Sequence, residues 1–201
     1  MQESQFIFIE TGLLPAIEKI LPVDGKGKTS LDLLEIGFGT GLNALLTQSE
    51  AEKHGMRVHY TAIEAFPLEE IYWKALNYPH LFGSVDLLQV FTNLHHAAWD
   101  NTVEISPHFT LHKVHGSLET YEPAPGAIDI IYFDAFGPDV QPELWTEQVF
   151  GKIYDGLRIG GTLVTYSVKG TVVRALRSSG FSTEKLPGPP GKRHILRAVK
   201  L

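Results

Sequence analysis

Apolar residues recur along the chain in two patterns, short continuous runs and helix-spaced positions, and the two patterns alternate from residue 31 onward. The runs predict strands at 31–36, 57–65, 109–116, 127–134, 160–168, 181–186 and 194–201. Helical spacing predicts helices within 41–55, 67–91, 142–157 and 169–180, the second broken at Pro79 and the last ended by Gly180. The segment 95–108 lacks clear periodicity, so we expect a long loop there.

The alternation of strands and helices predicts an α/β fold. Strands that are separated by helices form a parallel sheet with helices on both faces. The last two predicted strands are joined by "PGPPGKR" and are expected to form a hairpin. With this hairpin the sheet has seven strands and is mostly parallel.

Composition bounds the class of protein. The 201 residues are 43% hydrophobic, which is enough for one full core, so we expect a single domain over residues 1–201. The absence of cysteine excludes a disulfide framework, a thiolate metal site and a cysteine nucleophile. The N-terminus lacks the basic flank and long apolar stretch of a signal peptide, and no apolar run is long enough to cross a membrane. We therefore expect a cytoplasmic protein without a membrane partner.

Charge is distributed unevenly along the chain. Residues 1–150 contain 21 acidic and 7 basic residues, a balance of −14. Residues 151–201 contain 2 acidic and 10 basic residues, a balance of +8. Such asymmetry indicates either a polyanionic partner on the basic side or simply solvated helix and strand faces.

Glycines and acids follow the predicted strands, at the edge where a parallel sheet binds ligands. Gly37, Gly39 and Gly41 let the backbone turn tightly and approach a ligand at a helix N-terminus. Glu64 follows the second strand. A carboxylate at this position either accepts hydrogen bonds from both ribose hydroxyls of a nucleoside or is simply a solvated acid at the end of a strand. Asp134 ends the fourth strand, within "IDIIYFDAFGPDVQPELW", although a buried strand has no structural need for an acid there. Together these residues predict a nucleoside-binding site.

The glycine spacing distinguishes between kinds of nucleoside. A dinucleotide fingerprint, Gly-x-Gly-x-x-Gly, would require a glycine at position 42, which is Leu42. The spacing found is Gly-x-Gly-x-Gly preceded by Glu35, and it resembles the first motif of the class I S-adenosylmethionine-dependent methyltransferases. A carboxylate at this point suits a cationic sulfonium with an ammonium group better than a pyrophosphate.

This resemblance implies a Rossmann-like fold and S-adenosylmethionine as the cofactor. Glu64 would hold the ribose, the Gly116–Ser117 turn would lie by the adenine, and Asp134 would lie beside the departing methyl group. The cofactor-binding residues that the resemblance implies are Glu35, Gly37, Gly39, Gly41, Asn43, Glu64, Gly116, Ser117 and Asp134.

Later segments resemble one family within that class. They are "DAFGPDVQPELWT", "GGTLVTYSVKGTVVRALRSSGF" and "PGPPGKRHILRA". They are similar to segments of the methyltransferase that completes 5-methylaminomethyl-2-thiouridine at the tRNA wobble position. In bifunctional relatives this domain is fused to a flavin-dependent oxidase domain, for which 201 residues leave no room, so the chain resembles the free-standing form. The resemblance implies N-methylation of the aminomethyl group of 5-aminomethyl-2-thiouridine, with the tRNA anticodon loop as the partner.

Two residues are expected to act on the acceptor. Asp134 would hydrogen-bond an amine N–H, orient the nitrogen lone pair and help a proton depart. Phe136 is held on its loop by Gly137 and Pro138. Its ring either stacks on a wobble base turned out of the anticodon loop or packs under the helix that begins near Pro142.

The basic C-terminal segment, residues 151–201, supplies the expected RNA contacts. Lys169, Arg174 and Arg177 are expected on one helix, and Lys192 and Arg193 lie on the loop "PGPPGKR". Phosphate contacts from such groups position a nucleic acid without reading its sequence. The expected RNA-binding residues are Lys169, Arg174, Lys192 and Arg193.

The histidines do not predict a metal site. His95 and His96 are adjacent and so diverge, and neither they nor His112 and His115 have a carboxylate at a metal-binding spacing. We interpret all four as surface or loop residues and expect no metal.

Two other functions are compatible with these motifs. One is transfer to another amine on the same fold, such as aminopropyl transfer in polyamine synthesis, although such a substrate favours acidic surroundings and the chain turns basic after the fourth strand. The other is a non-catalytic module that binds S-adenosylmethionine and RNA, against which the complete glycine loop and Asp134 argue.

Overall fold

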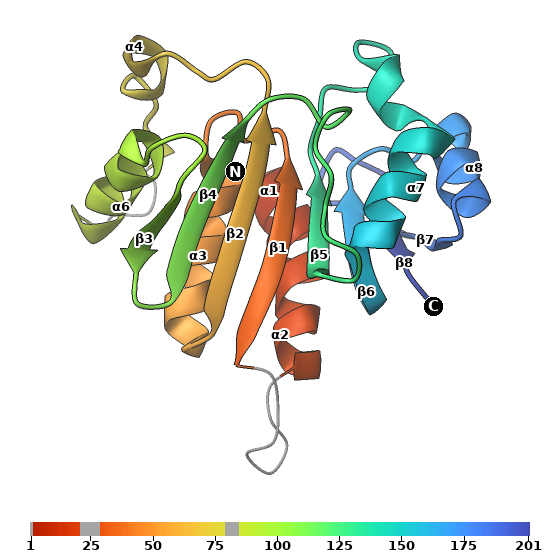
Figure 1. Ribbon diagram of the computed structural model, residues 1–201, viewed down its shortest axis with the longest axis horizontal. Coiled ribbons are helices and arrows are strands. Elements are labelled where there is room, and N and C mark those ends of the chain that lie inside the picture. Colours follow the sequence, from red (N-terminus) through yellow and green to blue (C-terminus); the bar gives the residue numbers. More distant parts are fainter. Residues whose placement is uncertain (1, 21–28, 79–84) are drawn as a thin grey trace.

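The computed structural model describes residues 2–20, 29–78 and 85–201, and its strands form one eight-stranded sheet (Figure 1). The parallel strands are β1 (Ser30–Ile36), β2 (Arg57–Glu64), β4 (Phe109–His115), β5 (Ile128–Phe133) and β6 (Leu157–Thr165). The order across the sheet is β3-β4-β2-β1-β5-β6-β8-β7. The predicted α/β class and mostly parallel sheet are confirmed.

The two edges of the sheet are antiparallel. At one edge β7 (Ser182–Pro187) and β8 (His194–Val199) form the predicted hairpin, and β8 pairs with β6. At the other edge β3 (Thr102–Ser106) pairs with β4 and adds an eighth strand. Two predictions are therefore wrong. Residues 95–108 do not form one long loop, and the sheet has eight strands rather than seven. This short edge strand packs only Val103 and Ile105 against the core, so its sequence carries a weak pattern.

Helices cover both faces of the sheet (Figure 1). One face carries α1 (Gln2–Ser4), a π-helix η1 (Gln5–Leu13), α2 (Leu14–Ile20), α3 (Leu42–His54) and α6 (Val85–His96). The opposite face carries a 3₁₀ turn, η3 (Pro142–Trp145), with α7 (Glu147–Gly156) and α8 (Gly170–Ser178). A short helix, α4 (Glu70–Trp73), follows β2, and the predicted break at Pro79 lies outside the described residues.

Strand β5 shows how the two cores are divided. Ile130 and Tyr132 belong to one core, whereas Ile131 and Phe133 belong to the other. Successive side chains of a strand point to opposite faces, so a strand that is buried on both faces reads as a continuous apolar run. Asp134 follows directly and ends this run at the edge of the sheet.

The N-terminal segment crosses the first face near the centre of the sheet. Residues of η1 contact β5, β6 and β8, and Ile7, Phe8 and Ile9 are buried. The Phe8 ring lies 5.0 Å from that of Tyr132. This packing brings α1 to the carboxyl ends of the strands. No helix in the described part of the chain combines the length and apolar character of a membrane span.

Candidate active site

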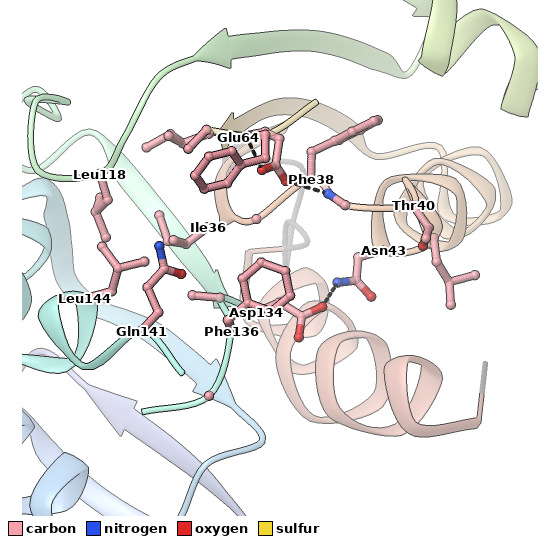
Figure 2. Close-up of a pocket in the computed structure, with 18 of the residues that line it drawn as sticks. Ile36, Phe38, Thr40, Asn43, Glu64, Leu118, Asp134, Phe136, Gln141 and Leu144 are labelled. Atoms are coloured by element: carbon pink, nitrogen blue, oxygen red, sulfur yellow. Dashed lines mark hydrogen bonds between the residues drawn. The ribbon is translucent and has the colours of Figure 1, made fainter. Parts of the chain in front are cut away.

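A cavity of about 560 Å³ lies at the carboxyl ends of the central strands (Figure 2). Its size is typical of pockets for small ligands and cofactors. Eight of the residues predicted for the site line it, namely Gly37, Gly39, Asn43, Glu64, Gly116, Ser117, Asp134 and Phe136. The structure therefore brings together residues from the ends of four different strands.

The glycine loop forms one wall of the cavity. Gly37 has a φ of +91°, and a side chain there would meet the Asp134 carbonyl oxygen at 3.0 Å. Gly39 has a φ of +49° and open space above it, so its backbone is accessible to a ligand. Gly41 also has a positive φ, but it caps α3 and does not line the cavity. Only glycine suits these backbone positions.

Glu64 is fixed by backbone donors rather than solvated as a free strand end. Its Oε2 accepts a hydrogen bond from the Gly39 N–H at 2.9 Å, and its Oε1 accepts one from the Phe66 N–H at 2.8 Å. Figure 2 shows the carboxylate turned toward the glycine loop. Each carboxylate oxygen has further acceptor capacity, which suits a diol that offers two hydroxyl donors. The Gly116 N–H in turn donates to the Glu64 carbonyl, which sets the neighbouring turn beside it.

A buried amide joins two carboxyl groups. Asn43 Nδ2 donates to Glu35 Oε1 and to Asp134 Oδ2, both at 2.8 Å. Glu35 is fully buried and does not line the cavity, so it acts on the site through Asn43 rather than by direct contact. Burial raises the pKa of Glu35 well above its usual value. Among the described residues, Asn43 Oδ1 has no hydrogen-bond partner.

Asp134 is a lining residue whose pKa is strongly perturbed. Burial raises its pKa to about 6, against the hydrogen bond from Asn43, and the charges of Glu3 and Lys192 add smaller effects of opposite sign. The side chain is thus mainly a carboxylate at neutral pH and becomes protonated in mild acid. A perturbed carboxyl group in a cleft is a typical functional residue.

Phe136 does not pack under the following helix, so the packing interpretation is wrong. Its side chain is 65% exposed and lines the cavity. Trp145 of η3 is the aromatic residue that packs there, against Phe133 and Phe150, and its Nε1–H donates to the Phe136 carbonyl at 2.8 Å. This bond fixes the backbone of the loop and leaves the Phe136 ring free at the rim.

Several lining residues were missed by the sequence analysis. They include Glu3, Ser4 and Phe8 from the N-terminal segment, and Tyr166 just after β6. Tyr166 donates its hydroxyl to the Ala135 carbonyl at 2.8 Å. The position of Tyr166 at a strand end could have identified it, whereas nothing in the N-terminal pattern indicated that Glu3 reaches the site.

The expected RNA-binding residues lie outside the cavity lining, and two of them are ion-paired. Lys169 immediately precedes α8 and pairs with Asp139, and Lys192 pairs with Glu3. Arg174 and Arg193 are exposed. Acids from the first 150 residues therefore neutralise part of the basic C-terminal segment. The charges that are separated along the sequence are in part paired in the folded molecule.

His95 is neither a surface nor a loop residue, which corrects its interpretation. It lies on α6, stacks on Trp73 with ring centres 4.5 Å apart, and donates from Nε2 to the Thr40 carbonyl at 3.3 Å. Burial lowers its pKa to about 4, so the ring is neutral at pH 7 and supports the glycine loop. Within the described ranges, no three metal-ligand side chains come together.

The arrangement fits a nucleoside with a cationic amino-acid end. Open backbone at Gly39 and acceptor oxygens on Glu64 suit a ribose, because they offer close approach and hydrogen-bond acceptors. The unpartnered Asn43 Oδ1 is a buried acceptor, which suits an ammonium donor. Asp134 provides a negative charge at the opposite side, beside an exposed aromatic ring.

Comparison with known proteins gives the family. The model of a family described as S-adenosyl-L-methionine-dependent methyltransferase matches residues 91–201. Over 98% of its length the chain is 32% identical to the tRNA 5-methylaminomethyl-2-thiouridine biosynthesis bifunctional protein MnmC of Magnetococcus marinus. It is 30% identical to the protein of the same name from Pseudomonas fluorescens. The chain spans 30% of the length of each of these relatives.

Solved structures share the fold. MNMC2 from Aquifex aeolicus matches 98% of this chain and 60% of its own, with a TM-score of 0.68 and 21% identity. A probable spermidine synthase from Corynebacterium glutamicum matches 99% of this chain and 64% of its own, with a TM-score of 0.55 and 15% identity. At these identities the two structures show the fold alone.

Proposed function

The chain belongs to the S-adenosyl-L-methionine-dependent methyltransferase family, and on that premise we propose that it methylates the aminomethyl nitrogen of 5-aminomethyl-2-thiouridine at the tRNA wobble position. Similarity to the bifunctional tRNA-modification proteins over 98% of the chain carries this proposal. In this proposal residues 1–201 act as one methyltransferase domain, in the cytoplasm, where tRNA is present.

We assign the cofactor to the cavity at the strand ends. Glu64 would accept hydrogen bonds from the ribose, the Gly116–Ser117 turn would border the adenine, and Asn43 would accept a hydrogen bond from the amino-acid end. Glu35 would keep Asn43 oriented through their hydrogen bond. When bound, S-adenosylmethionine supplies an electrophilic methyl carbon on a sulfonium.

Asp134 would align the acceptor amine. Its Oδ2 is held by Asn43, and the carboxylate can accept a hydrogen bond from the amine N–H, which fixes the direction of the nitrogen lone pair. Such placement contributes as much as ~7–11 kcal/mol to lowering a barrier. Because the pKa of Asp134 is about 6, the carboxylate form that this role requires predominates at neutral pH.

The RNA would approach the rim of the cavity that carries Phe136. This exposed ring is positioned to stack on an unpaired wobble base. Exposed Arg174 and Arg193, with Lys169 and Lys192 after release from their ion pairs, would contact phosphates around it.

The test is incubation of the chain with labelled S-adenosylmethionine and tRNA that carries the aminomethyl group, followed by nucleoside analysis. We expect label in the wobble nucleoside and none in matched tRNA with an unmodified wobble uridine. Transfer to putrescine instead of tRNA would support a small-molecule amine transferase. Cofactor binding without any transfer would support a non-catalytic binding module.

A further inference from the structure

A lysine side chain from outside the cavity lining contacts two residues that line its Asp134 side. Lys192 Nζ forms an ion pair with Glu3 and lies 4.6 Å from the centre of the Tyr166 ring. Glu3 and Tyr166 line the cavity together with Asp134. A carboxylate next to an aromatic face is a typical binding arrangement for an ammonium group, because both attract the positive charge.

Charge links these residues to the predicted reaction centre. The pKa of Asp134 responds to the charges of Glu3 and Lys192, in addition to burial and the Asn43 hydrogen bond. Burial raises the pKa of Tyr166 to about 12, and the charges of Asp134 and Glu3 add to the rise. Glu3, Tyr166 and Lys192 therefore lie within electrostatic reach of the Asp134 carboxylate.

We propose that Glu3 and Tyr166 form the subsite that recognises the ammonium group of the acceptor, and that Lys192 occupies this subsite as a resident cation until the acceptor arrives. The inference rests on the proposed function, in which the acceptor is a primary amine. A primary alkylamine is mostly protonated in water and resembles the lysine ammonium in charge and size. The acceptor ammonium replaces Lys192 at Glu3 and then gives up a proton, for which the Asp134 carboxylate is the acceptor, so that the free amine nitrogen which Asp134 aligns has a lone pair for the methyl carbon.

The replacement gives Lys192 two successive partners. Before RNA binds, its ammonium group neutralises Glu3 from the loop between β7 and β8. Once displaced, the side chain is free to contact a phosphate of the same RNA. Docking of the RNA and exposure of the amine subsite are then coupled, because both require Lys192 to leave Glu3.

The experiment uses single nucleosides, which have no phosphate for Lys192 to contact. Calorimetry on the full chain with S-adenosylhomocysteine measures the affinity of 5-aminomethyluridine and of its neutral analogue, 5-hydroxymethyluridine. We expect the amine to bind about fivefold more tightly than the neutral analogue, because one partly exposed ion pair contributes about that much to the affinity. Glu3→Gln should abolish this preference. Lys192→Met should increase the amine affinity about fivefold, because the competing cation is gone.

The matched control is Lys53→Met. Lys53 is ion-paired to Glu50 on α3, outside the cavity lining, and its loss should leave the affinity of both nucleosides unchanged. Equal affinity of the parent for both nucleosides, or an amine affinity that is unchanged or lower in Lys192→Met, would overturn the proposal. Loss of the proposed function is a separate result, because it appears as absent methyl transfer to tRNA while the amine preference persists.

Discussion

The two sides of the cavity are built in different ways. On the Glu64 side (Gly37, Gly39, Glu64 and Ser117), backbone N–H groups hold the carboxylate. One of its two partners is two residues further along the chain, and the other lies in the loop that follows the adjacent strand. On the Asp134 side (Glu3, Asp134, Phe136 and Tyr166), side chains meet from α1 and from the ends of β5 and β6. Its ion pair joins Lys192 to Glu3, 189 positions apart.

This difference matches two tasks. A site made from backbone groups changes little in shape, because strands and loop hydrogen bonds fix it, and this suits a cofactor of constant structure. A site made from exposed side chains and an ion pair adjusts at low cost, since such pairs contribute only about 0–1 kcal/mol. The second arrangement suits a large acceptor that must enter and leave.

The largest expected effect is on catalysis at the Asp134 side. Asp134→Asn should lower kcat by about 10²–10⁴-fold, since the neutral amide accepts the amine N–H poorly and cannot help a proton depart. In the parent, kcat should fall as the pH drops through about 6, where Asp134 becomes protonated. Single-turnover methyl transfer to tRNA measures both effects.

The control for this change is Asp139→Asn on the same loop, whose carboxylate is exposed, pairs with Lys169 and does not line the cavity. It should turn over at the parent rate. If Asp134→Asn kept a near-normal kcat, alignment of the amine by this carboxylate would be wrong.

The next effect concerns cofactor binding at the Glu64 side. Glu64→Ala should weaken S-adenosylhomocysteine binding by about 1–3 kcal/mol, because the ribose loses a charged acceptor and the Gly39 N–H loses its partner. Calorimetry measures the change, with Glu69→Ala, at an exposed position outside the lining, as the control. Unchanged affinity would refute the ribose assignment. By contrast, Asp134→Asn should alter this affinity much less.

The third prediction concerns the stability of the fold rather than the activity. Burial raises the pKa of Asp134 to about 6, so between about pH 4 and pH 6 the native state keeps a proton that the unfolded chain releases. The contribution of this group to the free energy of unfolding is present below about pH 4 and is lost as the pH rises through about 6.

In Asp134→Asn the side chain no longer titrates, so the free energy of unfolding is not reduced as the pH rises. The amide oxygen still accepts the hydrogen bond from Asn43. At pH 8 the variant should be more stable than the parent by about 3 kcal/mol, measured by urea unfolding, with little difference at pH 4. A variant less stable than the parent at pH 8 would show that the carboxylate supports the fold.

The smallest effect lies outside the cavity, on the basic surface beside the Asp134 side. Arg174→Glu/Arg193→Glu should reduce the slope of log affinity for tRNA against log salt by about 1–2 units, because phosphate contacts release counterions. Cofactor affinity should not change, since neither arginine lines the cavity. Filter binding across a salt series measures the slope. A parental slope in the double variant would locate the RNA surface elsewhere.

The charge pattern shows where reasoning from sequence reaches its limit. The +8 balance of the last 51 residues predicted a basic face, yet Lys169 and Lys192 are paired with acids from the first 150 residues. Ion pairs form between whichever charges folding brings together, and sequence distance does not restrict them. The prediction of RNA contacts therefore now depends chiefly on Arg174 and Arg193.

The sequence by itself determined the parallel strands of the sheet and the candidate residues at their carboxyl ends. Apolar runs alternate with helical segments, so the strands are parallel, and their carboxyl ends share one edge whatever the details of packing. That rule was sufficient to select the glycine loop, Glu64 and Asp134. These features depend on local periodicity and on a general rule of topology.

Only the tertiary structure decided the partial burial of His95, the exposure of Phe136 and the contacts of Lys192 with Glu3 and Tyr166. Each of these depends on which of several similar partners lies closest after folding, as when Trp145 rather than Phe136 packs under α7. Such contacts differ in energy by about 1 kcal/mol and leave no periodic pattern in the sequence. The physical reason is that local sequence specifies elements, whereas the choice among distant side-chain partners depends on the geometry of the whole fold.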